Sequence, residues 1–369
     1  MTRMPDDSVT PETLLSHVDG QAGSLIVCGH SLAELVAGFG FVGCATMLWQ
    51  MAATDPAAVS RPLGSEADRV AETEFARARI EAWALLPSLL PHAPAPDVNE
   101  ALRFLLSSLA AADSDLPEAV RLCGAVAVFA AALIRRETGQ PPLAPDPCRA
   151  HSADFLHMCR GAAVTAAEIA AIDAYLTTVA EHGMNASSYA ARVIASTRAG
   201  LIWAAIGGFC ALTGPLHGGA PGPVLDMLDR IGTADRAEPW LSEAIEQGER
   251  LMGFGHRIYR TRDPRADILK AQLAGLPHAA ESRAALAEQV ESTALRILSA
   301  RYPDRSLDTN VEFYTALLLD ALQIPRAAFT AVFAVGRMAG WTAHALEQER
   351  TGRLIRPASR YIGPVPVAA

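Results

Sequence analysis

Apolar segments of helical length, bounded by residues that start and stop helices, run through most of this sequence and constrain its fold more than any other feature. Pro117 precedes a long apolar segment that ends in the basic pair 135–136, and cations favour the carboxyl end of a helix. Thr165 and Glu168 have the spacing of a capping box. Alternation with a period of two, which marks half-buried strands, is rare. We therefore predict an all-α fold.

Other helix boundaries are also visible in the sequence. Asp263 and Pro264 mark the start of one helix, and residues 327–348 form a further long one. Segment 10–12, Thr-Pro-Glu, has the composition of a cap followed by a first-turn proline, so we predict a helix there as well. The best candidate for a short strand is segment 22–28, with the sequence AGSLIVC.

The length of 369 residues suggests two domains, on the usual figure of roughly 150 residues per domain. Segment 139–147 is rich in proline, which cannot continue a regular helix, so it predicts a rigid connector or a crossing strap. Segment 52–65 is rich in Ala, Pro and Ser, and we expect it to be an exposed loop.

The charge of the chain narrows the choice of partners. A formal net charge of −9 argues against nucleic acid or an anionic membrane as the main partner. The apolar runs near 122–134 and 200–212 are shorter than the roughly 20 residues that a membrane span needs. The first 15 residues lack the apolar core of a signal peptide, and the six cysteines show no paired spacing. We therefore expect a cytoplasmic protein with reduced, mostly buried thiols.

Three histidines stand in contexts that suit a binding site. His182 follows a helix, while His217 and His256 lie in the glycine-containing segments GPLHGGA and GFGHRIYR. Glycine lets the backbone approach a ligand closely. His217 precedes a helix N-terminus, where the helix dipole disfavours imidazolium, so a neutral ring there can donate a hydrogen bond to a carbonyl that becomes an enolate. Each histidine alone is also compatible with a structural role at a turn.

The charged candidates are Arg337, Arg265 and Glu312. Arg337 lies mid-helix among apolar neighbours, so its guanidinium needs an anionic partner, either a ligand or an internal carboxylate. Arg265 follows a helix cap, where a surface role is also open. Glu312 is flanked by Val311 and Phe313, and a carboxylate in apolar company can have a raised pKa and act as a base.

Zinc binding is the alternative use of three histidines and a carboxylate. The histidines are separated by 35 and 39 residues, which matches no local ligand motif. We therefore predict no metal site.

The order and spacing of these segments carry more information than any residue alone. PLHGGA, MGFGHRIYRTRDPRA, NVEFY, VGRMAGWTAHALEQ and LIRPAS follow one another along the chain. From about residue 139 to about residue 363, the sequence resembles the citrate synthase family. Upstream the resemblance is thinner, with only 23–35 similar to the opening of the family, and little in 52–100 can be aligned.

The resemblance implies a two-domain, all-α enzyme. Residues 1–219 and 318–369 would form a large domain and 220–317 a smaller inserted one. It also implies a homodimer with shared active sites, a place in the tricarboxylic acid cycle, and no permanently bound cofactor. The enzyme would be an acyltransferase that condenses acetyl-CoA with oxaloacetate, converting the acyl group to an alkyl group, and then hydrolyses the thioester to citrate and CoA.

Residue roles follow from the same resemblance. His217 matches the histidine that binds the thioester carbonyl, and His256 matches the one that polarises the oxaloacetate carbonyl. Glu312 occupies the position of the base. The expected oxaloacetate ligands are His182, Arg265, Arg337 and Arg356, the last donated across the dimer interface. The expected CoA-binding residues are Arg260 and the backbone of 252–256, including Gly253, Phe254 and Gly255.

One departure from the family pattern concerns the base itself. The family has Asp where this chain has Glu312, and Thr315-Ala316 replaces the usual Ser-Gly. The extra methylene moves the carboxylate by about 1.5 Å. A misplacement of about 1 Å can cost on the order of 10²-fold in rate.

This departure leaves several alternatives open. The acyl donor can be propionyl-CoA, giving 2-methylcitrate, or a longer acyl-CoA. The chain can be a catalytically silent paralogue that binds oxaloacetate or CoA, or a lyase that works in the cleavage direction. Allosteric regulation and the role of residues 36–100 are left open by the sequence.

Overall fold

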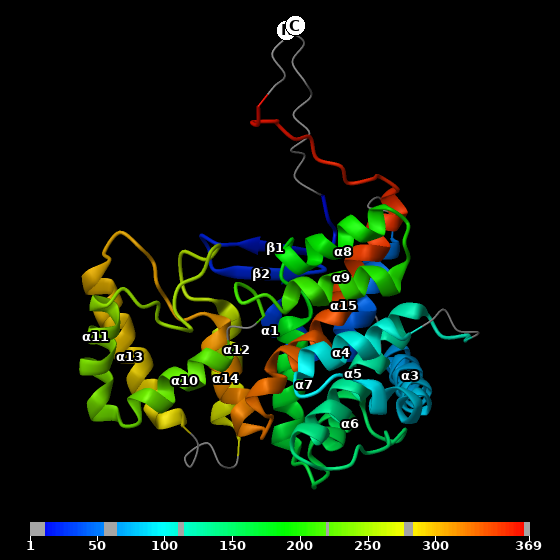
Figure 1. Cartoon of the computed structure of the whole chain (residues 1–369), viewed down its shortest axis with the longest axis horizontal. Coiled ribbons are helices and arrows are strands. Elements are labelled where there is room, and N and C mark those ends of the chain that lie inside the picture. The colour runs from blue at the N-terminus through cyan, green and yellow to red at the C-terminus, as the bar shows by residue number, and fades with distance from the viewer. Residues whose placement is uncertain (1–11, 55–64, 110–113, 219–220, 277–282, 365–369) are drawn as a thin grey trace, which may run out of the picture.

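The computed structural model describes residues 12–54, 65–109, 114–218, 221–276 and 283–364, and it confirms the all-α prediction. Helices make up almost all of its regular structure (Figure 1). The longer helices are α1 (Leu32–Gly38), α2 (Gly40–Ala53), α3 (Ser65–Leu89), α4 (Val98–Ser107), α5 (Glu118–Glu137), α6 (His151–Arg160), α7 (Ala166–Ala180), α8 (Ala186–Ser196), α9 (Leu201–Leu212), α10 (Pro221–Ile231), α11 (Ala237–Glu246), α12 (Pro264–Ala274), α13 (Ala284–Arg301), α14 (Val311–Ala321) and α15 (Phe329–Thr351). In the described part of the chain there are also three short 3₁₀ turns, η2 (Leu90–His92), η3 (Ala234–Arg236) and η4 (Arg326–Ala328).

The predicted helix boundaries are those of the structure at several positions. Pro117 is the N-cap of α5, whose last turn carries the basic pair 135–136. Thr165 and Glu168 form the complete capping box of α7. Asp263 caps α12 and accepts a hydrogen bond from the backbone amide of Arg265. Local cap chemistry therefore sets these ends.

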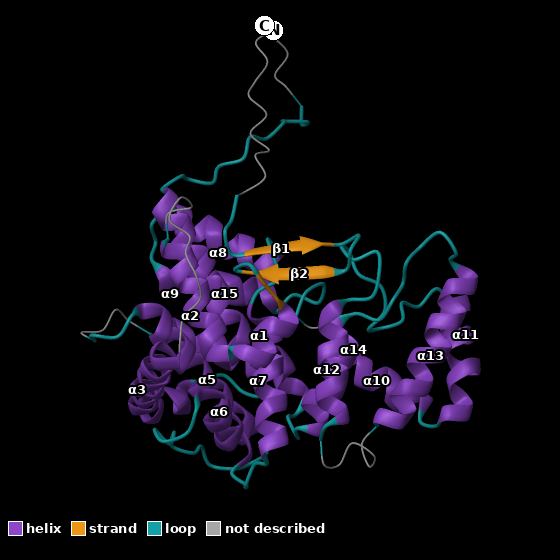
Figure 2. Ribbon diagram, turned by 180° about the vertical axis from the view of Figure 1, so that it is seen from behind, coloured by secondary structure: helices purple, strands orange, loops and turns teal. Residues whose placement is uncertain are grey.

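The prediction of a helix from segment 10–12 is wrong for the part of that segment that the structure describes. Residues 10 and 11 lie outside the described residues, and the chain from residue 12 leads into strand β1 (Ser16–Asp19). β1 pairs antiparallel with β2 (Ser24–Val27), which lies within the predicted strand 22–28, and β2 pairs with β3 (His30–Ser31) (Figure 2). Pairing with β2 decides the conformation of this segment, although its local sequence resembles a helix cap.

The hairpin is tied to both sides of the molecule. The hydroxyl of Ser16 donates to Glu181 at 2.8 Å and accepts from the backbone amide of Gly183 at 3.1 Å. At the turn, the carbonyl of Gly20 accepts from the amide of Arg260 at 2.8 Å. The hairpin therefore connects the end of α7 with the loop between α11 and α12.

Helix α15 is the centre of the core. It packs against α2, α5, α7, α8 and α9, and almost all of its side chains are buried. Two of its glycines, Gly336 and Gly340, lie directly against α7. A Cβ added at Gly336 would lie 2.6 Å from a methyl carbon of Val179, and one at Gly340 would lie 2.2 Å from the carbonyl oxygen of Ala180. The absence of side chains there allows the two helices to approach closely.

Helices α10 to α14 form a group beside the larger set of helices (Figure 1). Within this group α12 packs on α14, α10 on α14, and α11 on α13. The loop that leads to α12 is held to the segment before α14, because the amide of Gly255 donates to the carbonyl of Asp308 at 2.7 Å and the Asn310 side chain donates to Gly255 at 2.8 Å.

The proline-rich segment 139–147 has no regular structure, as predicted. A buried cluster holds the chain that follows it. Arg79 from α3 forms an ion pair with Asp154 at 2.7 Å and binds the carbonyl of Arg149 at 3.0 Å. The predicted loop 52–65 lies almost entirely outside the described residues.

No described helix is long and apolar enough to cross a membrane. All six cysteines are free, and four of them are buried: Cys28, Cys44, Cys123 and Cys159. At the other end of the chain, residues 352–364 follow α15 as an extended segment that runs away from the helices (red in Figure 1).

The close contact between α7 and α15 makes a stability prediction. Gly340→Ala places a methyl group against the Ala180 carbonyl, and overpacking of this kind costs about 1–3 kcal/mol. We expect a lower free energy of unfolding in denaturant titration. Gly38→Ala, in α1, is the matched control, because an added Cβ meets no atom within 4 Å there, and it should be neutral or slightly stabilising. Equal stabilities of the two variants would contradict this account of the packing.

Candidate active site

The three predicted histidines come together from separate parts of the chain. His182 follows α7, His217 lies between α9 and α10, and His256 lies in the loop between α11 and α12. The rings of His182 and His256 are in edge-to-face contact, with centroids 5.6 Å apart. Arg265 and Arg337 are near enough to lower the pKa of both His182 and His217. The structure therefore brings these five residues into one cluster.

The hydrogen bonds of His256 fix its tautomer. Its Nδ1 accepts the backbone amides of Ile258 at 3.0 Å and Tyr259 at 3.1 Å, so the proton of the neutral ring is on Nε2. Burial, and then the positive charge of Arg265, lower the pKa of His256 to about 4. Nε2 lies 3.4 Å from Nη2 of Arg265, and both groups are donors. Together they present two N–H groups to an acceptor.

His182 is buried and lies against Tyr259. Its Nε2 is 3.1 Å from the Tyr259 hydroxyl. Burial is the main cause that holds the pKa of His182 well below its usual value, followed by the charges of Arg265 and Arg337. The ring is therefore neutral at physiological pH.

His217 is half-buried, and burial followed by Arg337 lowers its pKa to about 4. Its Nε2 is 2.8 Å from the hydroxyl of Ser187, which also lies 2.7 Å from Oδ1 of Asn185. That amide oxygen already accepts two backbone N–H groups, from Ser187 and Ser188. When the Ser187 hydroxyl donates to His217 instead, the ring proton is on Nδ1, which is then free to donate elsewhere.

Arg265 is buried at the start of α12 and is held by its own cap residue. Its Nε donates to Oδ1 of Asp263 at 3.0 Å and its Nη2 to Oδ2 at 2.7 Å. Asp263 also accepts the backbone amide of Val311 at 3.2 Å, which links α12 to α14. This bidentate pair fixes the direction of the guanidinium.

Arg337, in α15, is 1% exposed and forms no ion pair within 4.0 Å among the described residues, although the charge of Glu181 is near enough to favour its charged form. Its Nε donates to the carbonyl of Val179 at 2.5 Å, and the guanidinium lies over the ring of Phe333 at 4.8 Å. Its Nη1 is buried with no hydrogen-bond partner in the described structure. Burial lowers the pKa of Arg337 to about 10, so it remains charged near neutral pH. Among the described residues Arg337 makes no direct carboxylate contact, and the buried Glu181 acts on its charge from a greater distance.

Glu312 lies in the first turn of α14, next to its N-cap Asn310, whose side chain accepts the Glu312 amide at 3.0 Å. Burial, which outweighs the nearby charges of Arg265 and Arg337, raises the pKa of Glu312 to about 7. Its Oε2 is buried without a partner among the described residues. This carboxyl group is poised to gain or lose a proton near neutral pH.

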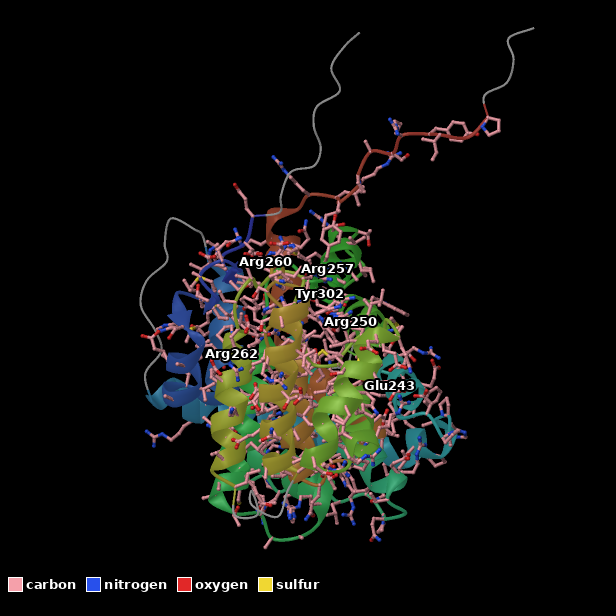
Figure 3. The ribbon with its side chains drawn as sticks, turned by 90° about the vertical axis from the view of Figure 1, so that its left-hand side faces the viewer. Glu243, Arg250, Arg257, Arg260, Arg262 and Tyr302 are labelled. Atoms are coloured by element: carbon pink, nitrogen blue, oxygen red, sulfur yellow. The ribbon has the colours of Figure 1, made fainter. Side chains whose placement is uncertain are left out.

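A cavity of about 580 Å³ opens beside His256. Phe254 and Gly255 line it, while Gly253 packs against Phe313 behind them. Its positive charge comes from four arginines, of which three are labelled in Figure 3: Arg250, Arg257, Arg260 and Arg305.

The four cavity arginines are available to a ligand, whereas the neighbouring Arg262 is not. Arg262 is committed to Asp267 and Glu291. Of the four cavity arginines the sequence analysis identified only Arg260. It also missed Asp263, Tyr259 and Ser187, although Asp263 and Tyr259 lie within the segment GFGHRIYRTRDPR.

Arg356 is the predicted site residue that lies neither in the cluster nor at the cavity beside His256. It is exposed on the extended segment 352–364. Its donation to the site of a second chain is still a prediction.

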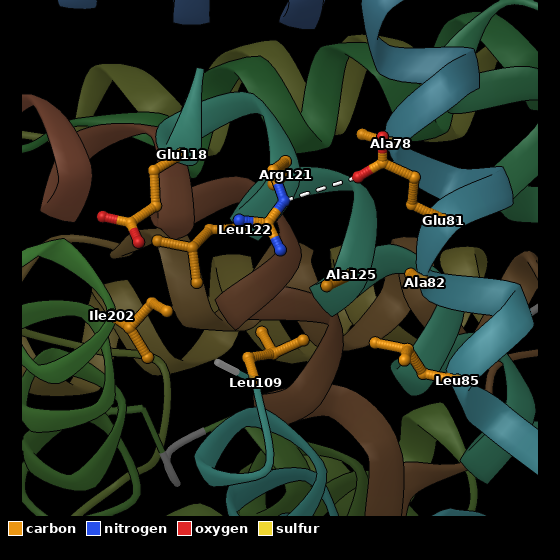
Figure 4. Close-up of a pocket in the computed structure, with 10 residues that line it drawn as sticks. All are labelled: Ala78, Glu81, Ala82, Leu85, Leu109, Glu118, Arg121, Leu122, Ala125 and Ile202. Carbon is orange, nitrogen blue, oxygen red and sulfur yellow. Dashed lines mark ion pairs between the residues drawn. The ribbon is translucent and has the colours of Figure 1, made fainter. Parts of the chain in front are cut away.

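A second cavity, between α3 and α5, does not suit a substrate. It holds about 20 Å³, room for little more than a water molecule, and its Arg121–Glu81 ion pair spans 3.4 Å (Figure 4). No group of three metal-ligating side chains is found among the described residues.

The comparisons with known proteins identify the family of this chain. The family model described as "Citrate synthase, C-terminal domain" matches residues 6–358. The putative citrate synthase 2 of Mycobacterium tuberculosis is 47% identical over 223 residues, 60% of this chain but only 58% of that relative's length. The 2-methylcitrate synthase of the same organism is 32% identical over 364 residues, covering 96% of this chain and 88% of the relative.

A solved structure extends the likeness to the fold. The crystal structure of citrate synthase from Thermotoga maritima is 31% identical and superposes with a TM-score of 0.83, covering 98% of this chain and 96% of that one. Sequence and fold thus agree over nearly the whole chain, which belongs to the citrate synthase family.

Proposed function

We propose that this protein condenses an acyl-CoA thioester, acetyl-CoA in the first instance, with oxaloacetate and then hydrolyses the thioester to citrate and CoA. The observation that carries the proposal is the buried guanidinium of Arg337, which has an unpaired N–H group and no carboxylate partner in the described structure. Burying such a charge is costly unless an anion completes it. A dicarboxylate bound between Arg337 and Arg265 supplies that anion.

Glu312 is the proposed base of the first step. Its carboxylate takes a proton from the carbon next to the thioester carbonyl, and the electron pair moves onto the thioester oxygen. In this step the Ser187 hydroxyl turns from Asn185 to donate to Nε2 of His217, so that the neutral ring donates Nδ1–H to that oxygen as charge develops on it. A neutral donor suits this step, because the low pKa of His217 leaves its ring uncharged at neutral pH.

His256 is the proposed electrophilic partner in the second step. Its Nε2–H donates to the ketone oxygen of oxaloacetate, whose carbonyl carbon the enol carbon then attacks. The new carbon–carbon bond leaves charge on that oxygen, which takes up the Nε2 proton, and water returns a proton to the ring during the hydrolysis that follows. Arg265 next to Nε2 stabilises the developing negative charge. Water then cleaves the thioester to release CoA.

The CoA moiety is proposed to occupy the arginine-lined cavity beside His256. Its phosphates need several fixed cations, and Arg260 with its neighbours supplies them. We further propose that 220–317 moves as a small domain against 1–219 and 318–369. Such closure would exclude water until the condensation is complete.

A second candidate is 2-methylcitrate synthesis from propionyl-CoA. It is favoured by the 2-methylcitrate synthase relative and by Thr315 and Ala316, which change the residues next to the base. A silent paralogue, which would bind oxaloacetate or CoA without turnover, is the third candidate, and thiol release separates it from the two enzymes.

Arg337→Met tests whether the buried guanidinium binds the ligand. We expect calorimetry to show oxaloacetate affinity reduced by about 100-fold or more, since truncating one partner of a buried charge pair costs about 2–5 kcal/mol. The fold should persist, because the variant breaks no direct ion pair among the described residues and the buried Glu181 keeps its hydrogen bonds to Ser16 and His344. Arg326→Met, which breaks only exposed ion pairs, is the control and should bind normally. Unfolding of the Arg337 variant would instead assign Arg337 a structural role.

Glu312 variants test the base. We follow hydrogen–deuterium exchange at the thioester α-carbon with an unreactive oxaloacetate analogue bound. Exchange should increase as pH rises through about 7, because only the carboxylate accepts a proton. Glu312→Gln should be nearly inactive. Glu312→Asp should be slower by about 10- to 100-fold if the pocket fits the longer arm.

Two outcomes of that experiment would change the account. Equal exchange by wild type and Glu312→Gln would remove Glu312 from the mechanism. A faster Glu312→Asp variant would show that the pocket keeps the geometry of the shorter residue.

Arg356 tests the proposed homodimer with shared sites. An inactive Arg356→Ala chain mixed with an inactive His217→Ala chain should regain part of the activity, because some heterodimers assemble one intact site. Subunit exchange is verified by mass spectrometry of differently tagged chains. Verified exchange without any recovery would count against sharing.

A further inference from the structure

Strand β1 contacts the site at both of its ends, although the mechanism above uses no residue of the hairpin. The hydroxyl of Ser16 donates to Oε1 of Glu181 at 2.8 Å and accepts the backbone amide of Gly183 at 3.1 Å. These two residues flank His182, an expected oxaloacetate ligand. One hydroxyl, used both as donor and as acceptor, therefore holds the chain on either side of a binding side chain.

Glu181 is held from α15 as well. Nη1 of Arg192 lies 3.2 Å from Nδ1 of His344, and arginine is only a donor, so Nδ1 accepts and the ring carries its proton on Nε2. Nε2 donates that proton to Oε1 of Glu181 at 3.1 Å. The carboxylate is thus fixed by α15 and by β1 together, and a loss of the Ser16 hydroxyl leaves the bond from α15 in place.

The other end of β1 contacts the loop of His256. The carbonyl of Gly20 accepts the amide of Arg260 at 2.8 Å. A Cβ added at Gly20 would lie 2.3 Å from the carbonyl oxygen of Ile258, so a side chain here would push the two segments apart. His256 depends on the same segment, because its Nδ1 accepts the amides of Ile258 and Tyr259. The hairpin therefore supports the turn that orients the His256 ring.

These contacts form a closed circuit through the site. Nε2 of His182 is 3.1 Å from the hydroxyl of Tyr259, and the next residue, Arg260, is bound to Gly20. From Gly20 the chain leads back through β1 to Ser16, four residues or about 13 Å away. All four residues of β1 pair with β2, so the length of this connection is fixed.

We propose, on the basis of the proposed function, that β1 is a positioning strand of the active site. Ser16 orients His182, the proposed ligand of oxaloacetate. Gly20, at the other end, holds the loop that carries His256. Neither residue touches the substrates. They act by fixing the distance between the two histidines, since site groups must be held within about 0.5 Å of the productive geometry by their supporting contacts.

Ser16→Ala tests the first contact, because it removes the hydroxyl while Glu181 keeps its bond from His344. We expect calorimetry to show oxaloacetate affinity reduced by about 10-fold, the effect of about one hydrogen bond. Ser16→Thr, which keeps the hydroxyl on a residue that strands favour, should restore the affinity. In a His182→Ala background, adding Ser16→Ala should change the affinity by less than about 2-fold, because residues that act through one another are not additive.

Ser152→Ala is the matched control. Its hydroxyl also donates to a carboxylate, Oδ1 of Asp173 at 2.6 Å, but this bond joins α6 to α7 rather than β1 to the residues around His182. The control should lose thermal stability to an extent similar to Ser16→Ala and should bind oxaloacetate as the wild type does. A general loss of stability would lower the affinity of both variants.

Gly20→Ala tests the second contact by forcing the hairpin away from Ile258. We expect kcat for thiol release to fall by about 10-fold or more, since moving a catalytic group by about 1 Å can cost on the order of 10²-fold. Gly38→Ala, whose added Cβ meets no atom within 4 Å, should keep the wild-type kcat.

The outcomes separate this proposal from the proposed function. Wild-type affinity in Ser16→Ala, or an equal loss of affinity in Ser152→Ala, would overturn the role of Ser16. An undiminished effect of Ser16→Ala in the His182→Ala background would overturn it too. Wild-type kcat in Gly20→Ala would overturn the role of Gly20. A wild-type protein that binds no oxaloacetate would defeat the proposed function itself and this proposal with it, which no result on the variants can do.

Discussion

The close contact between α7 and α15 is the constraint on which the site depends. Gly336 and Gly340 let α15 lie against the backbone of α7, and this approach brings the Arg337 guanidinium to the carbonyl of Val179. His182 follows α7 directly. This helix pair therefore sets the distance between Arg337 and His182, the cationic and the neutral group proposed to bind the dicarboxylate. Larger residues on either helix would separate them, since packed cores do not deform continuously.

Electrostatics adds a second constraint. The protein keeps His182, His217 and His256 neutral by burial beside Arg265 and Arg337, and the same burial keeps Glu312 close to its titration point. Groups held in this way gain a partner when a ligand arrives and need little rearrangement. Preorganisation of this kind is the main source of rate enhancement in many enzymes. Arg265 illustrates its cost, because it needs Asp263 to hold it in place.

Much of the architecture could be predicted from the sequence, and the reasons differ from element to element. The capping box at Thr165 and the cap at Asp263 are local, so they are visible without knowledge of the fold. Strand β1 could not be predicted in this way, because its partner β2 decides its conformation. The histidines and arginines of the cluster could be predicted only through the order of their segments. Their neutral state and tautomers could not, because burial and backbone contacts set them.

The most direct test of the central claim is thiol release by the purified protein with oxaloacetate and a panel of acyl-CoA thioesters, with products identified by mass spectrometry. The account predicts CoA release that requires oxaloacetate, with citrate formed from acetyl-CoA or 2-methylcitrate from propionyl-CoA. Binding of oxaloacetate without CoA release from any thioester would contradict it, and would leave the chain as a binding member of its family.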